Sequence, residues 1–397
     1  MIDNTTAEFI QRIAPEIIGI RRQLHMFPEL SFEEFGTSQI ICEFLGNLGI
    51  EYRKVINTSV IATIMNNENY PTIAVRAEMD ALPIQDEKTC EYASRNSGIM
   101  HACGHDGIVA ITLGLAKILN EIRMELKCNI KFIFEPAEEI GKGAKALLEE
   151  GVLENPQVDR IIIFHLTNSA PLGMEIQRSV STAEICSLNI KITGKSCHWG
   201  EYNKGVDAIH AAGKVISTVR ELSNTHKSKM PVVIGIGTIS GGAKNNIVAE
   251  TVEMGGTLRT FCTEDRNDII KSLKQRFNAI EAESSALIEM SAVPSIPPIY
   301  NDAQLVELSA VIAEDVFGTN NACISSSPFL AGDNAAFYFN RVSGVRLVFF
   351  AQKNGEVNYP LHNSKFDFNE EIIPLAIETL YGIICKIQYL SHNSKYD

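Results

Sequence analysis

The sequence has no long apolar run and no strongly basic segment. A membrane-spanning helix needs about 18 or more apolar residues, and no such run occurs in the 397 residues. The first residues also lack the basic and apolar segments of a secretory leader. The net charge of −13 and the absence of a Lys/Arg-rich run argue against binding to a phosphate backbone. We therefore expect a cytoplasmic protein whose partners include neither membranes nor nucleic acids.

The cysteines also lack a pattern. There are nine, scattered along the chain and odd in number, without the paired spacing of a disulfide scaffold or a zinc ribbon. Hydrophobic residues make up 45% of the chain and charged residues 21%, which is ordinary for a globular protein. Because one hydrophobic core usually stops growing at about 250–300 residues, two domains are expected.

The first part of the chain has the pattern of an α/β domain. Helices are expected at residues 6–25, 35–48, 108–125 and 144–150, and strands at 59–65, 72–79, 129–134 and 160–164. These strands are apolar on both faces and alternate with helices. The pattern predicts a mostly parallel sheet with helices on both faces.

From about residue 184 the pattern changes. Strands at 187–193, 232–240 and 249–260 alternate with helices at 206–222 and 265–281, which predicts a small antiparallel sheet with two helices on one face. The proline-rich stretch 294–298 is interpreted as a linker, followed by helices at 303–316 and 371–391. We therefore expect one domain from residues 1–183 and 294–397, interrupted by an inserted domain from residues 184–293.

Polar side chains stand where three strands of the first domain end. The strand at 72–79 leads into Asp80, the next into Glu138 and Glu139, and the third into His165. Ligands collect outside the carboxyl ends of the strands in open α/β sheets. These side chains are therefore expected to meet at one edge of the sheet.

A cysteine and a histidine lie just before the longest helix, in the segment MHACGHDG at residues 100–107. Residues two apart do not share a helix face, so Cys103 and His105 can converge only in a loop, which the neighbouring glycines permit. A helix amino terminus also favours the thiolate, the form that binds metal. Alone, this loop has an equally good structural explanation.

The other candidates have ordinary explanations when each is taken singly. Acidic residues such as Glu138 and Glu139 are favoured in the first turn of a helix. His165 fits a core histidine, and His362 fits a surface loop. In the functional interpretation, Glu139 ligates a metal while Glu138 stays free as a general base.

Together, the candidate ligands form a set that suits Zn²⁺, or Mn²⁺ and Co²⁺ where oxygen ligands dominate. They are Cys103, His105, Glu139, His165 and His362. Five ligands are more than one tetrahedral ion needs. Two cations about 3.5–4 Å apart, sharing a ligand and a water, account for the surplus.

Seven motifs in a fixed order connect the sequence to a known family. They are RQLH (22–25), PELSFEE (28–34), RAEMDALP (76–83), HACGHD (101–106), PAEE (136–139), GGTLRT (255–260) and LHN (361–363). In these motifs the chain resembles, over nearly its whole length, the dinuclear-metal amidohydrolases. That family includes hippurate hydrolase, N-acyl-L-amino-acid amidohydrolases (aminoacylases) and indole-acetyl-amino-acid hydrolases. Carboxypeptidase G and succinyl-diaminopimelate desuccinylase are more distant members.

The resemblance implies a role for each candidate in the first domain. Cys103 is shared by two divalent cations, Zn or Mn with Co or Ni as further options, and the other four candidate ligands complete the site. Glu138 is the general base. Asp80 orients or polarises the site without binding metal itself.

The resemblance also implies that the inserted domain is a lid and dimerisation domain with a four-stranded antiparallel sheet and two helices. His198 matches a histidine that reaches across a homodimer to stabilise the oxyanion. Asn246 and Arg259 match residues that hold the substrate's carboxylate.

The implied reaction is metal-dependent hydrolysis of the amide bond of a small N-acyl amino acid, releasing a carboxylic acid and a free amino acid. Three alternatives stay open. The first is a dipeptidase or N-acyl-diaminopimelate deacylase of the same family. The second is a catalytically silent homologue, and the third is a thiol hydrolase using Cys103 with His105 or His165.

Several positions depart from the usual family pattern. Glu78 replaces an aspartate and Ile108 a frequent histidine. Trp199 makes the surroundings of the lid histidine bulkier, and Asp333 with Asn334 replaces a Glu-Asp pair. The last two changes are expected to line the substrate pocket, which would favour an unusual acyl group or amino acid.

Overall fold

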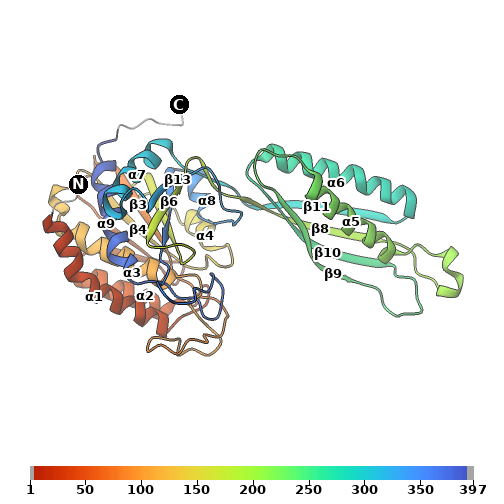
Figure 1. The fold of residues 1–397 in the computed structure, drawn as a ribbon, viewed down its shortest axis with the longest axis horizontal. Helices are drawn as coiled ribbons and strands as arrows, with labels where there is room; N and C mark the ends of the chain where they lie inside the picture. Colours follow the sequence, from red (N-terminus) through yellow and green to blue (C-terminus); the bar gives the residue numbers. More distant parts are fainter. Residues whose placement is uncertain (1–3, 391–397) are drawn as a thin grey trace. The chain divides into compact units, whose positions relative to one another are not determined.

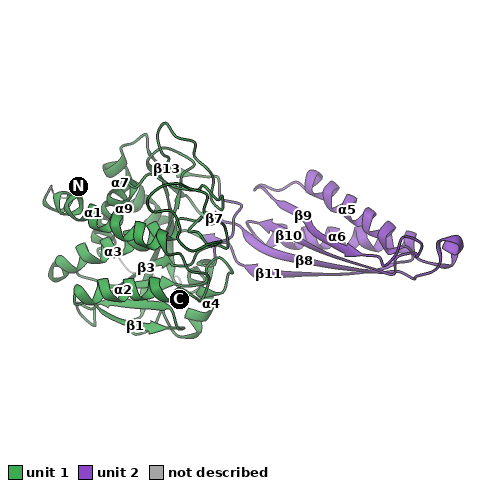
Figure 2. Cartoon of the chain, turned by 90° about the horizontal axis from the view of Figure 1, so that it is seen from below, with its two compact units in different colours: residues 1–181, 300–327, 334–397 green, residues 182–299, 328–333 purple. Residues whose placement is uncertain are grey.

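The structure, a computed structural model, describes residues 4–390 and divides into two compact units (Figures 1 and 2). Unit 1 comprises the described residues up to Ser181, Tyr300–Ser327 and those from Asn334 onward. Unit 2 comprises Thr182–Ile299 and Pro328–Asp333. Among the described helices, none is both long enough and apolar enough to cross a membrane.

Unit 1 contains most of the helices and one large sheet. In chain order its elements are α1 (Asn4–Met26), α2 (Phe35–Asn47), β1 (Glu51–Val55), β2 (Ser59–Ile64), β3 (Thr72–Glu78), α3 (His105–Glu121), η1 (Arg123–Glu125), β4 (Asn129–Glu135), α4 (Gly143–Glu149), β5 (Val158–Thr167), β6 (Gly173–Gln177), α7 (Ala303–Phe317), β13 (Ala322–Ser325), α8 (Ala336–Phe339), β14 (Ser343–Phe350) and α9 (Ile372–Ile387). Two short strands, β7 (Val180–Thr182) and β12 (Ile299–Tyr300), lie where the chain passes between the units.

The sheet of unit 1 has the strand order β1-β2-β4-β3-β5-β14-β6-β13. Its central strands are parallel: β3 pairs with β4 and β5, and β5 pairs with β14. The antiparallel pairs, β1 with β2, β2 with β4 and β6 with β14, lie on either side of them. The predicted mostly parallel sheet is confirmed, and the carboxyl ends of β3, β4 and β5 share one edge.

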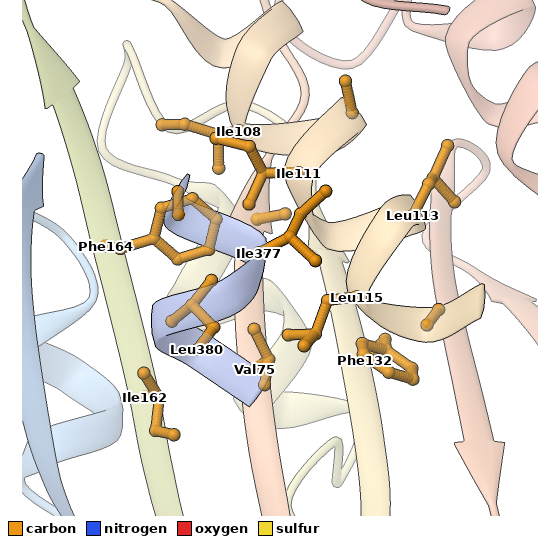
Figure 3. Packing of buried hydrophobic residues seen from close by; sticks show 14 of the residues in the cluster. Val75, Ile108, Ile111, Leu113, Leu115, Phe132, Ile162, Phe164, Ile377 and Leu380 are labelled. Atoms are coloured by element: carbon orange, nitrogen blue, oxygen red, sulfur yellow. The ribbon is translucent and has the colours of Figure 1, made fainter. Parts of the chain in front are cut away.

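One face of this sheet packs against α3 and α9, which in turn contact α1. Val75 of β3, Phe132 of β4 and Phe164 of β5 lie in one buried cluster with Ile108 of α3 and Ile377 of α9 (Figure 3). Ile108 is fully buried. The isoleucine that stands in place of the family's histidine therefore serves the hydrophobic core.

The opposite face carries a buried polar cluster around Arg76. Its guanidinium pairs with Glu78 and donates to Glu135 (Nε to Oε2, 2.9 Å) and Asn334 (Nη2 to Oδ1, 2.6 Å). The Tyr338 hydroxyl of α8 also donates to Glu135 over 2.8 Å. Two departures from the family pattern, Glu78 and Asn334, thus contact the same cation.

The positions 333 and 334 do not form an open pocket wall. Asp333 is 6% exposed and Asn334 is 0% exposed. The expectation for Asn334 is corrected, because its side chain supports the end of β3 through Arg76.

Unit 2 is an antiparallel sheet covered by two helices on one face. Its elements are β8 (Glu184–Thr193), η2 (Trp199–Lys204), α5 (Ala208–Thr225), β9 (Val233–Gly241), β10 (Thr251–Thr260), α6 (Thr263–Ser284) and β11 (Leu287–Ile296), with the strand order β11-β8-β10-β9. Alternate residues of β8, such as Leu188 and Ile190, lie in one buried cluster with residues of both helices. This confirms the predicted α+β architecture.

The interpretation of residues 294–298 as a linker is wrong at its start. Strand β11 continues through Pro294 to Ile296 and pairs with β8. Proline is tolerated because β11 is an edge strand, where a missing N–H need not break a ladder.

Other boundaries differ from the prediction as well. Helix α3 begins at His105 and ends at Glu121, instead of covering 108–125. The predicted helix 371–391 is α9, Ile372–Ile387, and residue 391 lies outside the described residues. Strands β1, β6, β7, β11, β12, β13 and β14 lie where no strand was predicted.

Candidate active site

The first part of the site is the loop that precedes α3. Gly104, directly before the helix, has a φ of 81°, a left-handed conformation that glycine adopts without strain. The chain therefore turns between Cys103, which stays outside the helix, and His105, its first residue. This turn lets the side chains of Cys103 and His105, which are two positions apart in the sequence, face the same site.

The second part is the turn between β4 and α4. Glu138 and Glu139 lie in this turn, five and four residues before α4 begins at Gly143, so the first-turn explanation for the acidic pair does not apply. A side chain at Gly143 would collide with the main-chain oxygen of Pro136. Ala137 has a φ of 55°, which is rare for a residue with a Cβ. The turn is thus held in an unusual shape that presents both carboxylates.

Hydrogen bonds orient two of the imidazoles. His105 donates from Nδ1 to the main-chain oxygen of Asp80 over 2.8 Å, and His165 donates from Nδ1 to the main-chain oxygen of Leu166 over 2.8 Å. Each ring then keeps its Nε2 lone pair for another partner. This is the arrangement of a metal-binding histidine, whose other nitrogen donates to a fixed oxygen.

All five predicted ligands lie in interlocking groups whose ligand atoms are within 4.8 Å of one another. The groups are Cys103, His105 and His165; Cys103, Glu139 and His362; and His105, Glu138 and Glu139. Cys103 Sγ is 3.5 Å from His165 Nε2, and Glu139 is 3.9 Å from His105 Nε2 and 3.7 Å from His362 Nε2. Cys103, His105 and Glu139 each belong to two groups, so the geometry accommodates more than one cation.

Two atoms in this cluster indicate that it is built for cations. His105 Nε2 and Glu139 Oε1 are both buried, and neither has a hydrogen-bond partner among the described residues. Buried polar atoms are rarely left without a partner, and a divalent cation would supply one to both. The residues present therefore fit a metal centre.

The surroundings of two candidate ligands shift their pKa values in the same direction. Burial raises the pKa of the Cys103 thiol well above its usual range, against the lowering that the helix amino terminus was expected to provide. Burial lowers the pKa of His105, but Cys103, Asp80 and Glu139 outweigh it and raise the pKa overall. The anionic neighbours of His105 therefore favour positive charge at this position, which a bound cation would also supply.

Asp80 is held in place beside the cluster. The Ser31 hydroxyl donates to its Oδ2 over 2.7 Å and the Glu139 N–H over 3.0 Å. Burial raises the pKa of Asp80, but the interactions with His105 and Ser31 lower it by more, so the pKa lies below its usual value. Asp80 therefore stays ionised and connects the ends of β3 and β4. Ser31 was not singled out from the sequence, although it lies within the PELSFEE motif.

His362 is attached to the Cys103 loop by its main chain. Its N–H donates to the main-chain oxygen of Ala102 over 2.8 Å, and its φ of 64° is unusual for a residue with a Cβ. Its side chain is 53% exposed. His362 thus forms the solvent-facing side of the cluster.

The remaining candidates lie in unit 2, at opposite ends of its sheet. His198 pairs with Ile247 in an isolated bridge, and the Trp199 N–H donates to the Asn246 oxygen, so His198 and Asn246 are neighbours. Arg259 pairs with Ile185 and lies eight residues along β10 from Thr251. At about 3.4 Å per residue, Arg259 and Thr251 are about 27 Å apart. Arg259 and Asn246 of one chain are therefore too far apart to bind the same end of a small substrate.

The chain matches known proteins over most of its length. Residues 74–386 match the model of peptidase family M20/M25/M40. The chain belongs to this family. An N-acetylcysteine deacetylase of Bacillus subtilis (strain 168) is 34% identical over 364 residues, which cover 91% of this chain and 93% of the relative. The IAA-amino acid hydrolase ILR1-like 4 of Arabidopsis thaliana is 30% identical, with coverage of 96% and 89%.

A solved M20 structure has the same fold. The YXEP protein of Bacillus subtilis, described as a dinuclear metal binding peptidase, has a TM-score of 0.83 at 31% identity, and the match covers 95% of this chain and 99% of that one. Membership in the M20 family confirms the predicted resemblance, fold class and enzyme class, a metal-dependent amidohydrolase. The relatives named as an N-acetylcysteine deacetylase and an IAA-amino acid hydrolase agree with the predicted type of reaction.

Proposed function

We propose that the chain hydrolyses the amide bond of a small N-acyl amino acid and releases a carboxylic acid and a free amino acid. The convergence of a thiol, three imidazoles and two carboxylates at one edge of the unit 1 sheet carries this proposal. The relatives support the substrate class, since their names describe an N-acetylcysteine deacetylase and an IAA-amino acid hydrolase.

In the proposed site, Cys103, His105, Glu139, His165 and His362 would hold two cations. Zinc or manganese suits this mixed set of sulfur, nitrogen and oxygen donors, with cobalt or nickel as further options. When bound, the cations would lower the pKa of a shared water and polarise the scissile carbonyl.

Glu138 is proposed as the general base. It lies beside Glu139 in the same group of ligand atoms, where it can reach a water held by the cations without being one of the five proposed ligands. Its carboxylate takes a proton from the attacking water and passes it to the leaving amine. Asp80 acts indirectly, by fixing the orientation of His105 and of the Glu139 main chain.

His198 is proposed to stabilise the oxyanion from the partner of a homodimer. Its Nδ1 accepts a hydrogen bond from the Gly200 N–H over 3.0 Å, so Nε2 carries the proton and can donate to an oxyanion. Asn246 lies next to it, and Arg259 lies at the other end of the same sheet. The separation supports a site that takes Arg259 from one protomer and His198 with Asn246 from its partner.

Coexpression of two inactive variants tests this arrangement. Neither Glu138→Gln nor His198→Ala alone should support turnover at a substantial rate. Mixed dimers should regain activity, because the protomer with an intact Glu138 receives an intact His198 from its partner. Separately expressed variants mixed as preformed dimers serve as the control. Mixed dimers as inactive as either parent would place His198 outside a shared site.

A panel of substrates tests the proposed reaction. Purified protein with added Zn²⁺ or Mn²⁺ should release amine from at least one of the N-acetyl, N-benzoyl, N-succinyl and indole-acetyl amino acids. Dipeptides and N-acyl-diaminopimelates belong in the same panel, since preferential cleavage of either would favour that alternative. Metal binding without turnover of any compound would favour a silent homologue.

A further inference from the structure

One buried arginine contacts residues that are close in sequence to the candidate ligands, but it belongs to none of the ligand groups. Arg21 of α1 is 0% exposed. Its Nε is 2.8 Å from Asp106 Oδ2, its Nη2 is 2.9 Å from Asp367 Oδ1 and its Nη1 is 3.1 Å from Glu370 Oε1. The guanidinium also lies against the ring of Tyr92, 4.9 Å from its centroid. One planar cation therefore joins three carboxylates from two distant parts of the chain.

The first of these carboxylates is fixed from a second side. His25 Nδ1 is 2.7 Å from Asp106 Oδ2, and His25 Nε2 is 3.5 Å from Asp86 Oδ2. Asp86 in turn pairs with Lys88 over 3.1 Å and accepts from the Ser94 N–H over 2.9 Å. Asp106 therefore has little freedom to move.

The second carboxylate is fixed in the same way. Asp367 accepts from the Tyr92 hydroxyl over 2.7 Å and from Lys353 Nζ over 2.6 Å. It also accepts from Arg21 and from the Phe368 N–H, so four donors hold one buried carboxylate.

The network holds the two chain segments that carry His105 and His362. Asp106 directly follows His105, and Asp367 lies five residues after His362. These histidines belong to different ligand groups that have Cys103 or Glu139 in common, so their spacing affects whether both groups can hold a cation. We propose that Arg21 is a positioning residue that fixes the spacing of His105 and His362 through Asp106 and Asp367. This inference rests on the proposed metal-dependent function.

A guanidinium is required because its planar fork bonds several carboxylates at once in fixed directions. A lysine would keep the charge but bind as a single point. Buried ion networks are weak evidence for stability alone, and specifying a geometry is the better attested use. Groups that orient metal ligands typically contribute about 10- to 100-fold to metal affinity.

The test measures Mn²⁺ binding to metal-stripped full-length protein by calorimetry. Arg21→Lys should remain folded by circular dichroism and bind Mn²⁺ about 10- to 100-fold more weakly than the wild type. Arg22→Met is the matched control. Arg22 binds the same Glu370 (Nε to Oε1, 3.0 Å), but its side chain is 45% exposed and it has no bond to Asp106 or Asp367 among the described contacts. Its Mn²⁺ affinity should stay close to that of the wild type.

A second, milder variant keeps the test decisive if Arg21→Lys does not fold. Tyr92→Phe removes only the hydroxyl that donates to Asp367 and keeps the ring against Arg21. It should weaken Mn²⁺ binding in the same direction, with a smaller effect. Folded variants with wild-type Mn²⁺ affinity, or an equal loss in Arg22→Met, would overturn the positioning role. A wild-type chain that binds no Mn²⁺ or Zn²⁺ would instead overturn the proposed function.

Discussion

Replacing Glu138 with glutamine should lower turnover by about 10²–10⁴-fold, the usual contribution of a general base, while the protein keeps its metals. Glutamine has nearly the same shape as glutamate but cannot accept a proton at neutral pH. The loss should therefore appear in kcat, with little change in KM. Steady-state kinetics and metal analysis of the same preparation measure both effects.

Two further substitutions show whether the effect is specific to Glu138. Glu139→Gln should lose metal as well as activity, because Glu139 lies near both His105 and His362. Glu149→Gln, on the exposed side of α4, should behave like the wild type. A Glu138→Gln enzyme with wild-type turnover would remove Glu138 from the mechanism.

Removal of metal should abolish activity, and Zn²⁺ or Mn²⁺ should restore it. In the proposed mechanism all five candidate ligands bind the cations, and the pKa of the attacking water is near neutrality only beside a cation. Dialysis against a chelator, followed by metal titration with turnover as the readout, checks this. Recovery should saturate at two ions per chain.

The same experiment separates the metal mechanism from a thiol mechanism. Cys103 Sγ is 3.5 Å from His165 Nε2, which is close enough for a thiol hydrolase pair. Burial, however, raises the pKa of that thiol, so little thiolate is present to attack a substrate. Mass spectrometry after iodoacetamide should find the exposed Cys323 modified, as an internal control, and the buried Cys103 largely unmodified. Full activity after chelation, lost on alkylation of Cys103, would establish the thiol mechanism instead.

The sequence predicts much of the fold because apolar periodicity is a local signal. The strands and helices that carry Asp80, Cys103, Glu139 and His165 or lead into them were predicted, with boundaries that differ by a few residues. Strand β14 was missed, although its run SGVRLVFF has the composition of a fully buried strand. Pro294 was interpreted as part of a linker. A proline is tolerated in an edge strand, but whether a strand lies at the edge depends on how distant residues pair, which the local sequence does not show.

For the site, the sequence predicts which residues take part better than it predicts the contacts that hold them in place. The strand ends and the Cys-Gly-His loop indicate which side chains gather in unit 1. The contacts of Asp80 with Ser31 and of Asp106 with Arg21 join residues far apart in the chain, so no local pattern reveals them. The left-handed conformations of Ala137 and His362 carry no glycine signal either. Roles for His198, Asn246 and Arg259 come from the resemblance alone.

The cluster around Arg76 connects two features that look independent in the sequence. Glu78 and Glu135 already place two carboxylates on this one buried guanidinium, and Asn334 adds a neutral amide. An aspartate at position 334 would put a third anion beside a single positive charge, with no water to screen it. The uncharged residue at 334 thus keeps the number of anions on Arg76 at two, whereas glutamate in place of aspartate at 78 changes the length of the side chain and leaves the charge the same.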